Sequence, residues 1–432
     1  MQVRPQRVRL SGAATLVFLA LCAASPLQAQ NVKPPKVQLW LDLSTGTMAG
    51  MPEMDMGNPI GGLLGGLMGG GARGGAMGGA PTTYGMARGM GISPPRLLDI
   101  ALYNRLKPGQ EASQAIPAGM LMGASLPLLP LKPTPPGTHE SEPGDTPPDL
   151  ERPRGRVLIY WGCGDTVRPG QPLVINLATA QASDFGTAFA GRYVPDRSAR
   201  VGPGHAVYPN ERNTVTLKRD SSLQGEHQVT GDGIPANVRF SLGAQQDLLP
   251  AIDLSTSGTL SQAMQLRWTP LAQARAYYLH AMGKTGEDMV LWSSAETRDS
   301  GMGLFDYLPN ATVDRWIKDK LLLPADTQQC AVPAGIFQGS EGAMARMIAY
   351  GHESHLAHPP RPADPKAPWE PDWAVRVRVK SQTMAMLGES TGGGSPAARA
   401  GERGDTGTPA SPAPAAPALP NPLNMLRGLL GR

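Results

Sequence analysis

Residues 37–43 read "VQLWLDL", and Val and Leu alternate there with Gln, Trp and Asp. A period of two is typical of a strand with one buried face. This periodicity is lost in residues 44–93, which are rich in Gly and Met, and returns in "RLLDIALYNRL", residues 96–106. We therefore predict two neighbouring strands that are separated by a long, disordered Gly/Met-rich insertion.

Further strand candidates recur along the chain, separated by turns that contain glycine and polar residues. They are "RVLIYWG" (156–162), "NTVTLKR" (213–219), "GEHQVTG" (225–231), "NVRFSLG" (237–243), "GAMARMIAYGHE" (342–353) and "WAVRVRVKS" (373–381). Such spacing indicates a β-sandwich or a barrel. In the last candidate the valines face one way, and we expect a solvated face from the alternating cations Arg376, Arg378 and Lys380.

Residues 264–294 carry a pattern that resembles part of a fibronectin type III-like domain. The features are Leu266-x-Trp268-x-Pro270, Ala276-x-Tyr278-x-His280 and "VLWSS". The resemblance implies that Trp268 lies in a core between two sheets and that the Tyr-bearing strand pairs alongside. Because residues 311–324, "ATVDRWIKDKLLLP", have helical spacing instead of a closing hairpin, we expect a variant of this sandwich.

The chain as a whole resembles uncharacterised secreted proteins of proteobacterial type. The supporting blocks are "VQLWLDLSTGTMAGMP", "QAIPAGMLMG" and "LIYWGCGDTVRPGQP". This resemblance implies no activity.

The predicted fold class is mainly β, with two β-sandwich-like (Ig/fibronectin III-like) domains and long disordered Gly/Met-rich, Pro-rich and C-terminal segments. Prolines and acidic residues are dense in 127–153, which predicts an extended linker. The predicted segments are a signal peptide (1–29), N-terminal strands with the insertion (30–125), a Pro-rich linker (126–155), a β-rich domain continuing the N-terminal strands (156–255), a fibronectin III-like variant β domain (256–387), a disordered linker (388–420) and a short amphipathic terminal helix (421–432).

The N-terminus predicts export. Arg4, Arg7 and Arg9 precede an apolar run, and small Ala29 follows as a cleavage position, so we expect a cleaved signal peptide and a periplasmic or cell-envelope location. The whole chain has 39 Lys and Arg against 35 Asp and Glu; removing these three arginines leaves 36 against 35. This balance predicts no nucleic-acid partner. No later segment has 18 uninterrupted apolar residues, so we expect no transmembrane span in the mature chain.

Two cysteines, Cys163 and Cys330, remain after cleavage. In an oxidising compartment they could form one disulfide, although two buried thiols are an equally ordinary arrangement.

The sequence contains no convincing catalytic pattern. "GESTG" (388–392) fits a nucleophile elbow but is followed by a Gly/Ser/Ala/Pro tract, with no histidine after it. "GKT" (283–285) lacks the glycine that a phosphate loop needs, and "HESH" (352–355) is one residue short of a zincin helix. We expect no enzyme, and an envelope hydrolase with an unrecognised site is the second alternative.

Two metal hypotheses follow from residue type. Met51, Met54 and Met56 could bind Cu(I) or Ag(I) as soft thioether ligands, and a periplasmic metal-binding protein is the first alternative function. The other hypothesis is Zn²⁺ or Cu²⁺ bound by His352, His355 and His358; a solvated loop is the competing interpretation.

The tail and the insertion share a second pattern. "NPIGGLLGGLMG" (58–69) is echoed by "NPLNMLRGLLGR" (421–432), where Leu423, Leu426 and Leu430 would share one helical face. We expect this segment to dock on an envelope protein or a membrane surface. The predicted function is thus a noncatalytic, exported cell-envelope protein that binds or scaffolds.

Overall fold

The computed structural model describes residues 33–51, 82–89, 94–131, 154–181, 183–184, 198–301, 304–364 and 367–388. The predicted signal peptide, most of the insertion, most of the Pro-rich linker and the terminal helix lie outside these residues. The described chain is mainly β, as predicted, and its one α-helix is α3 (Asn310–Lys318). This helix falls in the segment whose helical spacing departs from a fibronectin III pattern.

Most strands belong to one mixed, 14-stranded sheet. In sheet order its strands are β6 (Leu173–Asn176), β5 (Arg156–Trp161), β13 (Asp288–Ser293), β12 (Ala276–Thr285), β16 (Ala343–His358), β17 (Trp373–Leu387), β1 (Val37–Met48), β2 (Arg96–Asn104), β7 (His205–Tyr208), β4 (Ser125–Pro130), β3 (Ala112–Ala115), β8 (Gly225–Gly231) and β9 (Arg239–Leu242). The short β14 (Leu323–Pro324) pairs with β12.

Three further strands form a small sheet in the order β10 (Leu254–Ser257), β11 (Met264–Trp268) and β15 (Gln329–Val332). Single 3-10 turns occur at η1 (Met86–Arg88), η2 (Ala118–Met120) and η3 (Ala244–Gln246).

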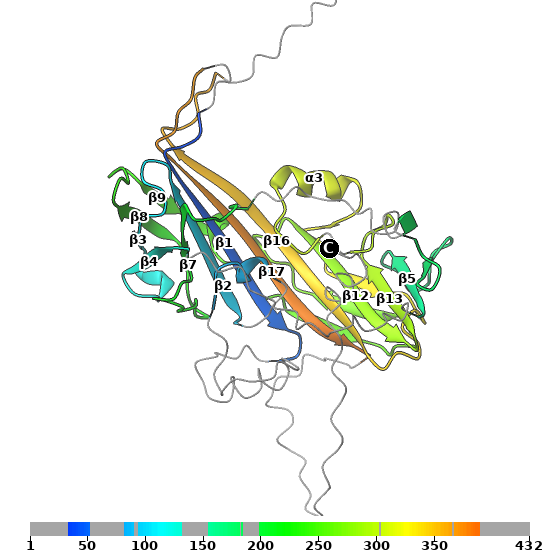
Figure 1. Ribbon diagram of the computed structural model, residues 1–432. Helices are drawn as coiled ribbons and strands as arrows, with labels where there is room; N and C mark the ends of the chain where they lie inside the picture. Colours follow the sequence, from blue (N-terminus) through cyan, green and yellow to red (C-terminus); the bar gives the residue numbers. More distant parts are fainter. Residues whose placement is uncertain are drawn as a thin grey trace, which may run out of the picture.

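The centre of the large sheet consists of β16, β17, β1 and β2, whose long strands cross the middle of Figure 1. β1 pairs antiparallel with β2, so the prediction that residues 37–43 and 96–106 form neighbouring strands is confirmed. β1 also pairs in parallel with β17 as far as Met48 and Met384. The predicted start of the insertion at residue 44 is therefore too early, because this pairing continues beyond the apolar alternation.

One continuous hydrophobic core fills the space between the large and small sheets. Trp268 of β11 and Tyr277 of β12 meet there with ring centroids 5.6 Å apart. The burial of Trp268 agrees with the expectation from the fibronectin III-like pattern. The expectation that the Tyr-bearing strand pairs alongside is wrong, because β12 belongs to the large sheet and β11 to the small one.

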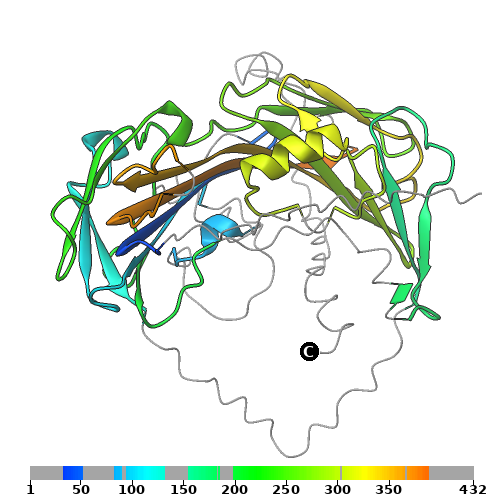
Figure 2. The same cartoon turned by 90° about the horizontal axis from the view of Figure 1, so that it is seen from above.

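Two local predictions are corrected by the structure. Residues 127–130, assigned to the linker, belong to β4, and the proline at 127 is tolerated because β4 pairs there with β3 alone. Residues 213–219 form only an isolated bridge between Asn210 and Asn213 instead of a strand. Seen from above, both ends of the large sheet bend toward the same side, and η1 lies within the bend (Figure 2).

Candidate functional site

The polar face of the central strands carries a set of charged side chains that the rest of the chain covers. We call it the buried charged cluster. Its sheet residues are Asp42 on β1, Asp99 on β2, Arg346 on β16, and Arg378 and Lys380 on β17, all at most 5% exposed. The cover consists of residues 82–89, where the insertion returns to the sheet, and residues 304–309.

Asp42 and Arg378 form the central ion pair of the cluster. The guanidinium donates two hydrogen bonds to the carboxylate, one of them from Nε to Oδ1 at 2.6 Å. Its carbon lies 4.6 Å from the ring centroid of Tyr307, which belongs to the cover. The expectation of a solvated cationic face on β17 is therefore wrong at Arg378 and Lys380, because segments distant in sequence fold over that face.

Lys380 is fully buried, and its ammonium lies among backbone carbonyl groups. Nζ donates to the carbonyl oxygens of Phe305 at 3.1 Å, Arg88 at 3.3 Å and Gly89 at 3.5 Å. It also lies 4.8 Å from the centroid of the Tyr307 ring. Backbone oxygens thus take the place of water around this charge.

Burial lowers the pKa of the Lys380 ammonium to about 7. Several charges around it act in both directions. Asp306 and Asp42 raise the pKa, whereas Arg346 and Arg378 lower it.

Asp99 ties the cover to β2. Its Oδ2 accepts a hydrogen bond from the N–H of Ala87 at 2.9 Å. Burial raises the pKa of the Asp99 carboxyl to about 7, and the nearby charge of Asp42 acts in the same direction. Tyr307 donates to the carbonyl of Ala87 at 3.2 Å, and Arg88 pairs with Asp306. The cluster therefore fixes the point at which the insertion re-enters the sheet.

Arg346 extends the cluster toward β12. It donates to Gln382 at 2.8 Å and lies 5.1 Å from the centroid of the Phe305 ring. Burial lowers its pKa to about 10, and burial also lowers the pKa of His280 to about 4, with Arg346 as a further cause. Because no solvent reaches Lys380, we interpret the cluster as a structural anchor for the cover.

A second feature is open to solvent and has the chemistry of a binding site. This pocket, which we call the aromatic groove, has a volume of about 800 Å³. β9 contributes Phe240 and Ser241, and the last part of β16 contributes His355, Leu356 and Ala357. The remaining lining residues are Pro360, Arg361, Trp369 and Trp373.

Contacts with neighbouring residues fix the two tryptophans of the aromatic groove. Trp373 donates from Nε1 to the carbonyl of Asn237 at 2.7 Å, and Trp369 donates to the carbonyl of Pro359 at 3.0 Å. The guanidinium of Arg361 lies 5.7 Å from the Trp369 ring centroid. The rings therefore have set positions, so little side-chain entropy remains to be lost on binding.

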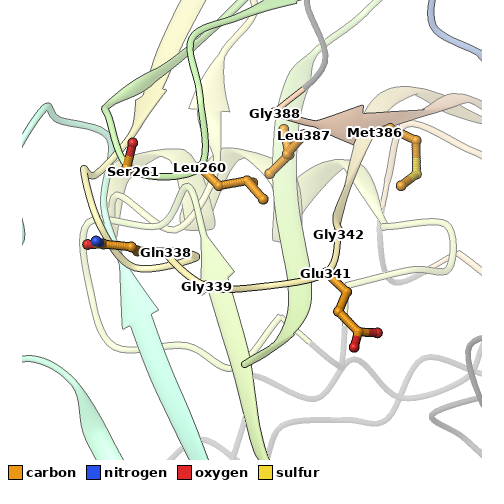
Figure 3. Close-up of a pocket in the computed structure, with 9 residues that line it drawn as sticks. All are labelled: Leu260, Ser261, Gln338, Gly339, Glu341, Gly342, Met386, Leu387 and Gly388. Carbon is orange, nitrogen blue, oxygen red and sulfur yellow. The ribbon is translucent and has the colours of Figure 1, made fainter. Parts of the chain in front are cut away.

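A smaller pocket of about 410 Å³ lies at the end of β17 (Figure 3). It lies between the loop with Leu260 and Ser261, the loop with Gln338 and Glu341, and residues 386–388. No aromatic side chain is among its lining residues in the described chain. The aromatic groove is thus the stronger candidate for a binding site.

The sequence-based site residues are distributed as follows. Cys163 and Cys330 form a disulfide with their Cα atoms 5.1 Å apart, so the bridge is present. His352, His355 and His358 lie on β16 and not in a loop. Within the described residues, no group of three or more His, Cys, Asp or Glu side chains could hold a metal ion.

The other predicted site residues fall largely outside the described chain. Met51 ends its described stretch, whereas Met54 and Met56 lie beyond it, as do Leu423, Leu426 and Leu430. The sequence reasoning missed Trp369 and Trp373, although "APWEPDW" (367–373) places two tryptophans within five residues. This density of tryptophan in a segment with two prolines was the signal from which the two residues could have been found.

Comparisons with known proteins do not identify the chain. No family model matches it, and no curated protein is similar to it. Among the described residues, no helix is both long and apolar enough to cross a membrane.

Proposed function

We propose that this chain is a noncatalytic, exported protein of the cell envelope that binds or scaffolds a partner in the aromatic groove. The observation that carries the proposal is the groove itself, which is lined by Trp369, Trp373 and Arg361, with Arg361 against the Trp369 ring. Trp and Arg are enriched among the residues that contribute most to binding energy at interfaces. Pockets of 300–1,000 Å³ are typical of binding sites, and the volume of this groove falls within that range.

The disulfide supports the proposed compartment. Structural disulfides persist in oxidising environments, and the bridge between Cys163 and Cys330 fits export by a cleaved signal peptide.

We further propose that the packing is sandwich-like in two halves, one of them a fibronectin III variant. The support is the position of β11 in the small sheet and of the hairpin β12–β13 in the large sheet. The core between them is continuous with the core under β1 and β2, so the two halves would share one hydrophobic interior. The copper-binding and hydrolase alternatives remain predictions.

Photocrosslinking in intact cells tests the proposed function. A photoreactive amino acid replaces Ser241, an exposed lining residue of the aromatic groove. Ser261, which is exposed and lines the smaller pocket, provides the matched control position. We expect a crosslinked partner from position 241 and none from position 261. Equal labelling at both positions, or none at 241, would argue against a partner in the groove.

A further inference from the structure

The aromatic groove lies along a seam between two strands that do not pair. β9 is the last strand of the large sheet, and two side-chain contacts place it beside the far end of β16 and the start of β17. Gln246, just after β9, donates to Ser354 of β16 at 3.0 Å. The ring centroids of Phe240 on β9 and Trp373 lie 6.3 Å apart. Phe240 and Trp373 both line the aromatic groove, which therefore occupies this part of the seam.

The edge of β16 at this seam carries backbone groups that point away from β17. The N–H and C=O of Glu353 both bond to the side chain of Asn310, at 3.0 and 2.8 Å. In an antiparallel strand, the direction of the backbone groups alternates from residue to residue. His355 and Ala357 therefore direct their N–H and C=O groups to the same side as Glu353. β12 does not pair this far along β16, since its ladder ends at Tyr350.

β9 presents a second open edge to the same groove. The N–H of Val229 donates to the C=O of Val238, one residue before β9, at 3.0 Å, so this pair continues the register of the β8–β9 ladder as a hydrogen-bonded pair. By the same alternation, Phe240 pairs with His227, and Ser241 directs its backbone groups away from β8. Ser241, His355 and Ala357 all line the aromatic groove.

We propose that the aromatic groove binds an extended segment of another protein, which adds as a strand to the open edge of β16 at His355 and Ala357. This inference rests on the proposed binding function and names the class of its partner. Strand addition uses main-chain hydrogen bonds for affinity and pockets for alternate side chains for specificity. The half-buried indole ring of Trp369 provides an apolar wall for those side chains, and Trp373, which is 6% exposed, joins this wall to the core.

Charge favours a segment that also carries an acidic residue. No acidic side chain lines the aromatic groove in the described part of the chain. Arg239 is exposed on β9 and lies on the same side of that strand as Ser241. Arg239 does not line the groove itself, so a carboxylate would meet it only from the end of the bound strand nearest Ser241, and the interaction would weaken with salt.

The test removes one backbone donor and changes only one side chain of the groove's lining, that of Ala357. Random decapeptides displayed on phage are selected on the mature chain, and the best peptides are synthesised with a fluorescent label. Their affinity is measured by anisotropy for the wild type, for Ala357→Pro and for the matched control Ala357→Ser. Proline lacks the N–H group yet is tolerated at a strand edge, whereas serine keeps it. Thermal melts of both variants test whether each of them folds.

We expect Ala357→Pro to weaken binding about tenfold and Ala357→Ser to leave it nearly unchanged, because a lost donor leaves a peptide carbonyl unpaired. Equal affinity for both variants would overturn strand addition while leaving the binding function intact. If the groove captures no peptide but the crosslink at position 241 forms to a glycan, the peptide class is wrong and the binding function stands. If neither experiment detects a ligand, both proposals fail.

Two other occupants would also overturn the proposal. Self-association of the mature chain in sedimentation, lost in Ala357→Pro, would assign the groove to a second copy. A peptide affinity that rises when residues 389–432 are deleted would assign it to the chain's own C-terminal segment. We expect neither effect.

Discussion

Substitution of Lys380 by Met should change the pH dependence of stability. In the folded wild type the pKa of Lys380 is about 7, compared with a reference value of 10.5. Between these values the unfolded chain binds more protons, so the free energy of unfolding of the wild type rises with pH. For this pKa difference the rise between pH 6.5 and 10 is about 4 kcal/mol. Met cannot titrate and therefore lacks this rise.

The assay is urea denaturation of both proteins across that pH range with the disulfide intact. We expect the free energy of unfolding of Lys380→Met, taken relative to that of the wild type, to be higher at pH 6.5 than at pH 10. Lys380 lowers the pKa of Asp99, so Lys380→Met raises that pKa and makes the variant lose further stability as pH rises, in the same direction as the expected difference. The exposed Lys284→Met is the control, and its difference from wild type should stay small throughout. A difference for Lys380→Met that is flat with pH would refute the account of a desolvated ammonium.

Three other changes test how the fold is held together. Replacing both Cys163 and Cys330 by Ser opens a loop of 167 residues, and the chain-entropy model gives a loss of about 5 kcal/mol as an upper value, measurable by urea denaturation. Asp42→Asn leaves a buried guanidinium without its anion and should lower the free energy of unfolding by about 3–5 kcal/mol in the same assay. Gly301→Ala should lower the melting temperature much more than Gly286→Ala does. Both glycines have positive φ, so the backbone strain is shared. A Cβ at position 301 would overlap the buried imidazole ring of His280, whereas a Cβ at position 286 meets open space.

The strands could be predicted because their pattern is local. Alternation in residues 37–43 reports the burial of Leu39 and Leu41 directly, and both are fully buried. The same reasoning from alternation predicted a solvated face on β17, and that prediction was wrong. There the alternation correctly separated valines from cations, yet Lys380 is buried because residues 82–89 and 304–309 cover it. Nothing near β17 in the sequence carries that information.

The aromatic groove could not be predicted for a related reason. Its walls come from β9, β16 and the segment that leads into β17, which meet only because the sheet curls back on itself. A pattern of period two fixes which face of a strand is buried, but it does not fix which strand edges remain unpaired. The tryptophan-rich segment 367–373 was visible in the sequence, but the groove it borders was not.

Amide hydrogen exchange tests the aromatic groove as a binding site most directly. The chain is followed by mass spectrometry with and without a selected peptide. We predict slower exchange in two segments, 239–242 and 353–358, which face each other across the seam. Residues 338–342, beside the smaller pocket, should be unchanged and serve as the internal control. Protection confined to 338–342, or absent from both segments of the seam, would contradict the assignment of the groove.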